Sequence, residues 1–350
     1  MDLSFYRNKV VLITGHTGFK GSWLSKILIM SGAKVVGYSL EPPTVPNLFS
    51  ILELEDQMVS IIGDIRDLDK LNKVFDRYQP EIVFHLAAQP IVRTSYECPV
   101  YTYDVNVMGT VNICECIRKH PSVKSFLNVT TDKVYENDDI PNHPFKEEEK
   151  LDGYDPYSNS KSCSEIITHS YYKSFLKALD VAVSTARAGN VVGGGDFSKD
   201  RIIPDAARAL KEKNDLIIRN PFSTRPYQHV LEPLFCYLLI AKEQYFNKDL
   251  CGAYNIGPDS EDFSTTQNLI ELFGKYIPEF KYKIQSDNGP HEAAFLSLDN
   301  HKIKNIFCWK PKTLIEDAMR LTAEWYLAWA NDDADLKKII ERQIKDFLYE

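Results

Sequence analysis

Lys9-Val-Val-Leu-Ile-Thr-Gly-His-Thr-Gly-Phe-Lys-Gly21 places a short apolar run directly before a loop with three glycines. The apolar run is typical of a buried strand, and residues 22–30 that follow the loop have the pattern of a helix. Glycine allows a tight turn and a close approach of the backbone to a ligand. Because the first amides of a helix are unpaired, this strand–loop–helix unit predicts a phosphate site.

Further strands and helices alternate along the first half of the chain. We expect strands over 34–39, 59–62, 82–86, 125–129 and 181–186, and helices over 68–77, 106–118 and 156–178. Such alternation forms βαβ units and a parallel sheet, whose ligands bind outside the carboxyl ends of the strands. The sequence therefore predicts an α/β fold, a Rossmann-type doubly wound parallel sheet with a smaller mixed α/β C-terminal substrate domain.

The composition changes after Asn190, where Gly193-Gly-Gly195 begins a stretch rich in arginine and proline. We expect residues 1–189 to form the dinucleotide-binding domain, with a return segment near 228–256. Residues 190–227 and 257–350 would then form the smaller domain over the crevice, with a helical C-terminus from about Ile315.

Charge and composition exclude several classes of protein. The 350 residues are 44% hydrophobic and 26% charged, and 41 basic against 49 acidic residues give a net charge of −8. This acidic balance argues against nucleic-acid and membrane-surface partners, which select a basic face. No apolar run reaches the length of a membrane span and no signal peptide is recognised, so a cytoplasmic location is expected. The seven cysteines show no disulfide framework, and no residue cluster has the spacing of a metal site.

Tyr157 and Lys161 are four residues apart in the expected helix over 156–178 and therefore share one face. A phenol with a pKa of about 10 is a poor base near neutral pH. An ammonium group beside it favours the phenolate, so Lys161 is expected to lower the pKa of Tyr157. The pair is interpreted as an acceptor for a hydroxyl proton, and Asp132 and Lys133, just after another strand, add two ionisable groups.

These features together resemble the extended short-chain dehydrogenase/reductase family over nearly the whole chain. Arg187-Ala-Gly-Asn190, Arg225-Pro-Tyr-Gln-His-Val230 and Trp309-Lys-Pro311 are similar to later segments of that family. Within it, Gly15-His-Thr-Gly-Phe-Lys-Gly21, Ala87-Ala-Gln-Pro90, Thr131-Asp-Lys133, Gly153-Tyr-Asp-Pro-Tyr-Ser-Asn-Ser-Lys161 and Gln228-His-Val-Leu-Glu-Pro233 are similar to the CDP-glucose 4,6-dehydratase group. The lysine of the Asp-Lys pair is typical of that group, because the dTDP-glucose enzymes have Asp-Glu there.

The resemblance implies NAD as cofactor and a nucleotide-sugar, CDP-glucose, as substrate. The residues implied in NAD binding are Gly15, Thr17, Gly18, Phe19, Gly21, Asp64, Ile65, Leu86, Ala87, Ala88, Tyr157 and Lys161. The second strand ends without the usual acidic residue, and no arginine stands there for a 2′-phosphate, so this position favours NAD over NADP only weakly. Asp64 could instead cap the helix that follows it.

The resemblance also assigns catalytic roles to Thr131, Asp132, Lys133, Tyr157 and Lys161. Tyr157 would remove the C4 hydroxyl proton, Thr131 would bind the C4 oxygen, Asp132 would protonate the leaving C6 hydroxyl, and Lys133 would remove the C5 proton. Asp132 would need a raised pKa in a dry pocket, and Lys133 a lowered one. A capping role for Asp132 and an ion pair or substrate contact for Lys133 remain alternatives.

Substrate contacts are expected from Gln89, Asn190, Arg201, Arg219, Arg225 and His291. Arginine forms bidentate contacts with phosphate oxygens, although Arg219 and Arg225 could equally form ion pairs, and His291 could be a solvated loop residue. His85 is interpreted as a core residue. Another nucleotide-sugar dehydratase and a nucleotide-sugar 4-epimerase are the alternative functions, and a homodimer or homotetramer is implied, with formation of deoxysugars for a lipopolysaccharide O-antigen.

Overall fold

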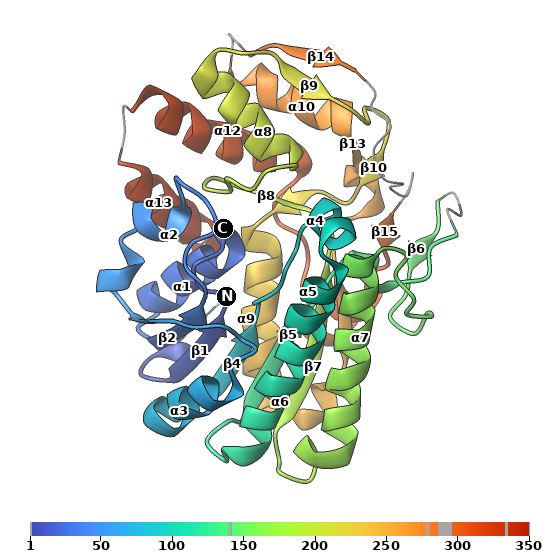
Figure 1. The fold of residues 1–350 in the computed structure, drawn as a ribbon. Helices are drawn as coiled ribbons and strands as arrows, with labels where there is room; N and C mark the ends of the chain where they lie inside the picture. Colours follow the sequence, from blue (N-terminus) through green and yellow to red (C-terminus); the bar gives the residue numbers. More distant parts are fainter. Residues whose placement is uncertain are drawn as a thin grey trace.

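The computed structural model describes residues 2–138, 140, 142–277, 280–285, 296–332 and 335–349. Its centre is a seven-stranded sheet in which every neighbouring pair is parallel (Figure 1). The strands, in spatial order, are β3 (Val59–Ile62), β2 (Lys34–Ser39), β1 (Val10–Thr14), β4 (Ile82–His85), β5 (Ser125–Val129), β7 (Ala182–Ala188) and β12 (Ala253–Ile256). The order reverses between β1 and β4, which is where doubly wound folds bind their ligands. The predicted fold class is confirmed.

Side chains alternate between the two faces of this sheet, as the two-residue period of a strand requires. Val11 and Ile13 of β1 belong to one apolar cluster, whereas Leu12 belongs to the other. The first cluster includes α1 (Phe19–Met30) and α9 (Leu231–Phe246), and the second includes α3 (Leu68–Tyr78) and α6 (Gly109–Lys119). Helices therefore cover both faces, and strand residues are buried whichever way they point.

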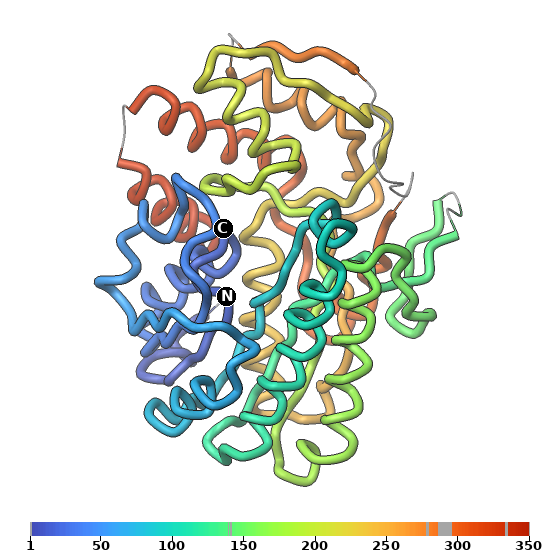
Figure 2. The backbone as a smooth tube through the Cα atoms, in the orientation of Figure 1, coloured from blue at the N-terminus to red at the C-terminus, as the bar shows by residue number. Residues whose placement is uncertain are grey.

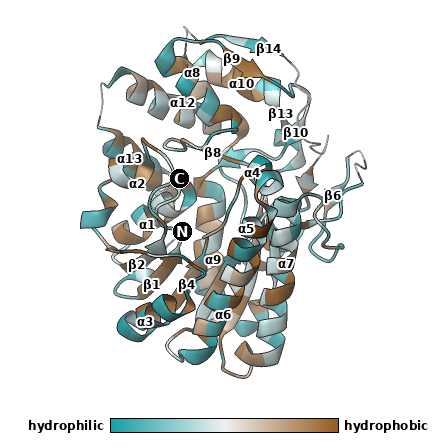
Figure 3. Ribbon diagram, viewed as in Figure 1, coloured by the Kyte–Doolittle hydropathy of each residue, from teal (hydrophilic) through white to brown (hydrophobic). Residues whose placement is uncertain are grey.

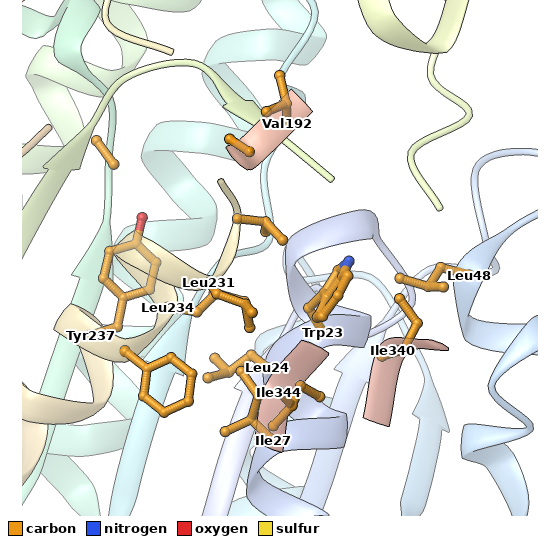
Figure 4. Close-up of a cluster of buried hydrophobic side chains, with 14 of the residues drawn as sticks. Trp23, Leu24, Ile27, Leu48, Val192, Leu231, Leu234, Tyr237, Ile340 and Ile344 are labelled. Carbon is orange, nitrogen blue, oxygen red and sulfur yellow. The ribbon is translucent and has the colours of Figure 1, made fainter. Parts of the chain in front are cut away.

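The helix α1 that follows the glycine loop is among the most deeply buried elements. Trp23, Leu24 and Ile27 pack against residues of α9 and of the C-terminal helix α13 (Leu336–Tyr349), as Figure 4 shows. An ion pair of 2.7 Å between Lys26 and Glu341 also joins α1 to α13. The start of α1, and with it the glycine loop, is thereby held by a rigid layer.

A second group of elements lies beyond the carboxyl ends of the strands (Figures 1 and 2). It contains α8 (Ile202–Glu212), β9 (Leu216–Ile218), α10 (Thr266–Lys275), β14 (Tyr282–Ile284) and α12 (Ile315–Asn331). Between its parts the chain returns to the sheet, because α9 packs on β5 and β7 and β12 pairs with β7. The start of α12 agrees with the predicted helical C-terminus.

Within the described residues, no helix is long and apolar enough to cross a membrane. All seven cysteines are free thiols. His85 is a core residue as predicted, since its Nδ1 lies 2.7 Å from Thr14 Oγ1 and burial lowers its pKa to about 3.

Candidate active site

A cavity of about 310 Å³ opens where the sheet meets the second group of elements. Eight of the residues singled out from the sequence line it, namely Thr131, Asp132, Lys133, Tyr157, Asn190, Arg201, Arg219 and Arg225. They come from the tip of β5, from α7 (Pro156–Tyr171) and from segments around α8 and β9. The sheet geometry thus gathers residues that are up to 94 positions apart (131 to 225) in one space.

Asp132 is the most deeply buried acid of this cavity, with an exposure of 1%. Its Oδ1 accepts a hydrogen bond of 2.9 Å from Thr131 Oγ1, and within the described part of the chain nothing hydrogen-bonds to its Oδ2. Burial raises the pKa of Asp132, while Lys133, the Thr131 hydroxyl, Arg225 and Lys20 lower it less. The raised pKa that the sequence argument required is therefore present. Thr131 caps the short helix Asp132–Val134, so the alternative that Asp132 serves as a cap is not supported.

Tyr157 and Lys161 lie on α7, one turn apart and both buried. The helix begins at Pro156, and Asp155 caps it by accepting from the Ser158 amide, which fixes Tyr157 in the first turn. Tyr157 also forms a side-chain hydrogen bond with Thr131. The Lys161 ammonium donates to the carbonyl of Val129 at 3.1 Å.

The prediction that Lys161 lowers the pKa of Tyr157 is wrong for this arrangement. Burial raises the pKa of Tyr157 to about 12, and the groups that oppose this are the Thr131 hydroxyl and Arg201. The reason is geometric, because Lys161 points to Val129 at the end of β5 while Arg201 approaches from α8. Burial lowers the pKa of Lys161 itself to about 8.

The glycine loop is shaped by close backbone approach. Gly15 has a φ of +78°, and a Cβ there would lie 2.8 Å from the amide of Ala87. A Cβ on Gly21 would lie 2.1 Å from the carbonyl of Gly15, whereas one on Gly18 would meet nothing closer than 3.4 Å. The loop therefore keeps a side-chain-free cradle at the start of α1, next to the strand-order reversal. This cradle fits the pyrophosphate of a dinucleotide.

The remaining predicted cofactor residues surround this loop. Thr17 Oγ1 donates to the Leu40 carbonyl at 2.8 Å and tethers the loop to the end of β2. The Asp64 carboxylate is held by Arg66 through hydrogen bonds of 2.7–3.1 Å, and the cap of α3 is Asp67 rather than Asp64. Phe19, Ile65, Leu86 and Ala88 follow directly on the loop, β3 and β4.

One of the predicted substrate residues, Gln89, is not brought into the cavity. The side-chain amide of Gln89 is occupied by hydrogen bonds to the backbone of Ile91 and to Thr102 Oγ1. Gln89 does not line the cavity, so the expected substrate contact is not supported. His291 lies outside the described residues.

The arginines differ in burial and partners. Arg225 is 5% exposed and donates to the carbonyl of Thr224 at 2.9 Å. Arg201 forms an ion pair of 3.0 Å with Asp196, and Arg219 one of 3.2 Å with Asp200. Three guanidinium groups on one wall favour an anionic ligand.

Sequence reasoning missed several residues of the site. Lys20, Arg93, Asp196 and Asp200 line the cavity. Lys20 stands inside the glycine loop, and burial together with Arg201 lowers its pKa to about 8. A charged residue at the start of an otherwise buried helix was a signal for Lys20. The others carry no local pattern. Arg93 lies on α4 (Val92–Glu97), whereas Asp196 and Asp200 lie in the segment before α8, and only the tertiary fold brings these segments together.

Known proteins share this fold and sequence. The family model for GDP-mannose 4,6 dehydratase matches residues 12–322. CDP-glucose 4,6-dehydratase of Salmonella typhimurium is 42% identical and covers 99% of this chain and 98% of its own length. The structure of dTDP-glucose 4,6-dehydratase from Bacillus anthracis in complex with NAD is 24% identical, with a TM-score of 0.76 and coverage of 91% and 96% of the two chains. UDP-glucose 4-epimerase from Thermotoga maritima gives a TM-score of 0.78 at 23% identity and coverage of 91% and 99%.

The two structures show the fold, whereas the family model and the Salmonella relative extend over nearly the whole chain. Resemblance to the extended short-chain dehydrogenase/reductases, drawn above from the motifs, agrees with them. The chain therefore belongs to the GDP-mannose 4,6-dehydratase family of nucleotide-sugar 4,6-dehydratases.

Proposed function

We propose that this protein is a hydro-lyase that converts CDP-glucose to CDP-4-keto-6-deoxyglucose with NAD as cofactor. The observation that carries the proposal is the buried Asp132, whose Oδ2 lies at the cavity without a hydrogen-bond partner among the described residues, beside Thr131 and Tyr157. An acid of this kind is needed to release water from a sugar and has no evident use in an epimerase. The similarity to the Salmonella CDP-glucose enzyme supports this choice of substrate.

Bound NAD would accept a hydride from C4 of the sugar and return it to C6. Tyr157 takes the proton of the C4 hydroxyl, and the positive charge of Arg201 favours its phenolate. Thr131 holds the C4 oxygen through its hydroxyl. The 4-keto group then acidifies the C5 proton, which Lys133 removes, while protonated Asp132 donates to the departing C6 hydroxyl, which leaves as water. As the hydride reaches C6, Lys133 returns the proton to C5. The glycine cradle would hold the pyrophosphate of NAD, and Lys161 would contact the nicotinamide ribose.

Incubation of the purified protein with CDP-glucose and NAD⁺ tests the proposal. The expected result is a 4-keto product that is one water lighter than the substrate, measured by its alkaline chromophore and by mass. Parallel reactions with UDP-glucose, dTDP-glucose and GDP-mannose determine the nucleotide preference. Conversion of glucose to galactose without a keto product would establish the 4-epimerase instead. Turnover restricted to another nucleotide would identify a different dehydratase.

Lys133→Met is expected to lower product formation by about 10²- to 10⁴-fold, the range that a general base contributes. The variant removes the amine that would accept the C5 proton, and the measurement is the exchange of C5 hydrogen with deuterated solvent. Lys173→Met is the control and should keep full activity, because Lys173 is exposed on the π-helical turn Tyr172–Leu176 that continues α7. Normal C5 exchange in Lys133→Met would leave Lys133 the substrate-contact role only.

Arg225→Met is expected to raise KM for CDP-glucose by about 10- to 100-fold with a smaller change in kcat. A lost hydrogen bond from a charged group to phosphate costs about 1.5–3 kcal/mol, and the contact exists before and during the reaction. Arg320→Met, which removes an exposed arginine of α12 outside the cavity, serves as the control in the same steady-state assay. An unchanged KM would assign Arg225 to a structural ion pair.

The chain is further proposed to form a homodimer through two helical segments of each subunit, with the homotetramer as a larger assembly. These segments are residues 101–120, which run from the end of α5 (Pro99–Tyr103) through α6, and residues 156–178, which include α7. Val100 is 81% exposed, Met108 47% and Ile166 56%, and apolar segments colour α5 and α7 in Figure 3. Exposed apolar side chains gathered on neighbouring helices are typical of a surface that another copy covers.

Ile166→Asp is expected to shift the protein toward the monomer, because it places a charge in the buried part of that interface. Size-exclusion chromatography with light scattering measures the mass. Ile140→Asp is the matched control, since Ile140 is equally exposed at 55% but lies in the loop after β5. A variant that keeps the mass of the parent protein places the interface elsewhere.

Residues 190–227 and 257–350 are proposed to bind the sugar nucleotide above the dinucleotide domain. The keto product would feed deoxysugar synthesis in the cytoplasm, as for a lipopolysaccharide O-antigen.

A further inference from the structure

A buried ion pair lies directly behind the candidate active site. Glu165 of α7 and Arg187 of β7 have side chains that are each 4% exposed. Arg187 Nε donates to Glu165 Oε1 and its Nη2 to Oε2, both at 3.0 Å. A buried ion pair adds little net stability, because the cost of removing two charges from water offsets their attraction. Its contacts therefore deserve a functional explanation.

Two threonines complete the hydrogen bonds of the Glu165 carboxylate. Thr130 donates to Oε1 at 2.5 Å, and Thr185 donates to Oε2 at 2.6 Å. Each carboxylate oxygen thus accepts two hydrogen bonds in these contacts. Arg187 is held from its far side by Tyr135 Oη at 2.8 Å, so the carboxylate has a fixed backing. Because Arg187 binds both oxygens of the Glu165 carboxylate, Oε1 is held where Thr130 donates to it, and this arrangement does not depend on the Thr185 contact.

Thr130 lies at the tip of β5 between Val129 and Thr131, and both of these neighbours contact residues of the candidate active site. Its predecessor Val129 offers the carbonyl that accepts from Lys161, and its successor Thr131 bonds to Asp132 and Tyr157. The pairing of β5 with β7 ends at Val129 and Ala186. Beyond it, two contacts hold the tip of β5, namely the hydrogen bond of 2.9 Å from the Thr130 amide to the Ala186 carbonyl and the contact of the Thr130 hydroxyl with Glu165. The carboxylate therefore determines where both neighbours of Thr130 point.

We propose that Glu165 is a positioning residue of the reaction, which fixes the tip of β5 through Thr130. The inference rests on the proposed dehydration. It assigns a role in turnover to a carboxylate that does not line the cavity.

Two matched variants separate positioning from stability. Thr130→Val and Thr185→Val each remove one hydroxyl from Glu165 without changing side-chain shape, but only Thr130 adjoins the catalytic residues. We expect Thr130→Val to lower kcat by about 10- to 100-fold with KM changed less than about twofold, as for a small misplacement of catalytic groups. Thr185→Val should retain the parent kcat, and Thr130→Ser, which restores the hydroxyl, should recover most of it.

Thermal unfolding and amide hydrogen exchange accompany these measurements. Faster exchange over residues 125–134 is expected in Thr130→Val and not in Thr185→Val, and it requires no substrate. Equal loss of kcat in both variants, or parent activity in Thr130→Val, would overturn the inference. Failure of the parent protein to dehydrate any nucleotide-sugar would instead contradict the proposed function, so the two failures are distinguishable.

Discussion

Asp132→Asn is expected to lower formation of the 4-keto-6-deoxy product by about 10²- to 10⁴-fold, because an amide cannot replace a general acid. Burial raises the pKa of Asp132 and keeps its proton available at higher pH than for an exposed carboxyl. Asparagine has nearly the same shape and can still accept from Thr131. Oxidation at C4 does not need this acid, so the variant should accumulate a keto sugar nucleotide that has lost no water.

Rapid quench followed by mass measurement of the sugar nucleotide distinguishes the two keto species. Asp138→Asn is the control, since Asp138 is an exposed carboxylate six residues further along. It should behave as the parent protein does. Unimpaired water loss by Asp132→Asn would sink the assignment of Asp132 as the acid.

Tyr157→Phe is expected to stop the reaction one step earlier, with product formation again lower by about 10²- to 10⁴-fold. The variant keeps the buried ring on α7 but loses the hydroxyl that takes the C4 proton and bonds to Thr131. No 4-keto sugar should appear, either with the C6 hydroxyl still in place or after loss of water. This differs from Asp132→Asn, in which the 4-keto sugar that keeps its C6 hydroxyl accumulates.

The same quench assay measures both variants. Tyr154→Phe removes a hydroxyl three residues earlier from a side chain that is 78% exposed, and it should leave the rate unchanged. Thermal unfolding checks that Tyr157→Phe is folded. A 4-keto sugar that keeps its C6 hydroxyl, formed by Tyr157→Phe, would mean that another group accepts the proton of the C4 hydroxyl.

The elements of the nucleotide-binding half could be predicted from local sequence. The apolar run before Gly15 forms β1 and the run over 125–129 forms β5, because a strand buried on both faces needs a continuous apolar segment. The expected helix over 106–118 begins later than predicted as an α-helix, since residues 104–108 form a π-helical turn. Whether a helical turn has α or π hydrogen bonds depends on how it packs against neighbouring elements. Residue propensities carry no information about that packing.

The candidate site was predicted as far as its motifs extend. Thr131, Asp132, Tyr157 and Lys161 follow recognisable spacings, and the structure places all four at the end of β5 or on α7. The orientation of their charges was not predictable. Lys161 points to Val129, so its influence on Tyr157 was overestimated.

The sequence by itself determined the parallel sheet, the glycine loop and the choice of candidate acid–base residues, because these depend on residue type and on spacing within one segment. Only the tertiary structure decided that Asp132 is buried and that Lys20 and Arg201 line the cavity. It also decided that Gln89 bonds to Thr102 and that Glu165 pairs with Arg187. The physical reason is that a pKa or an ion pair depends on water exclusion and on distances between atoms. Segments far apart in the chain set both, and they meet only when the second group of elements packs over the sheet.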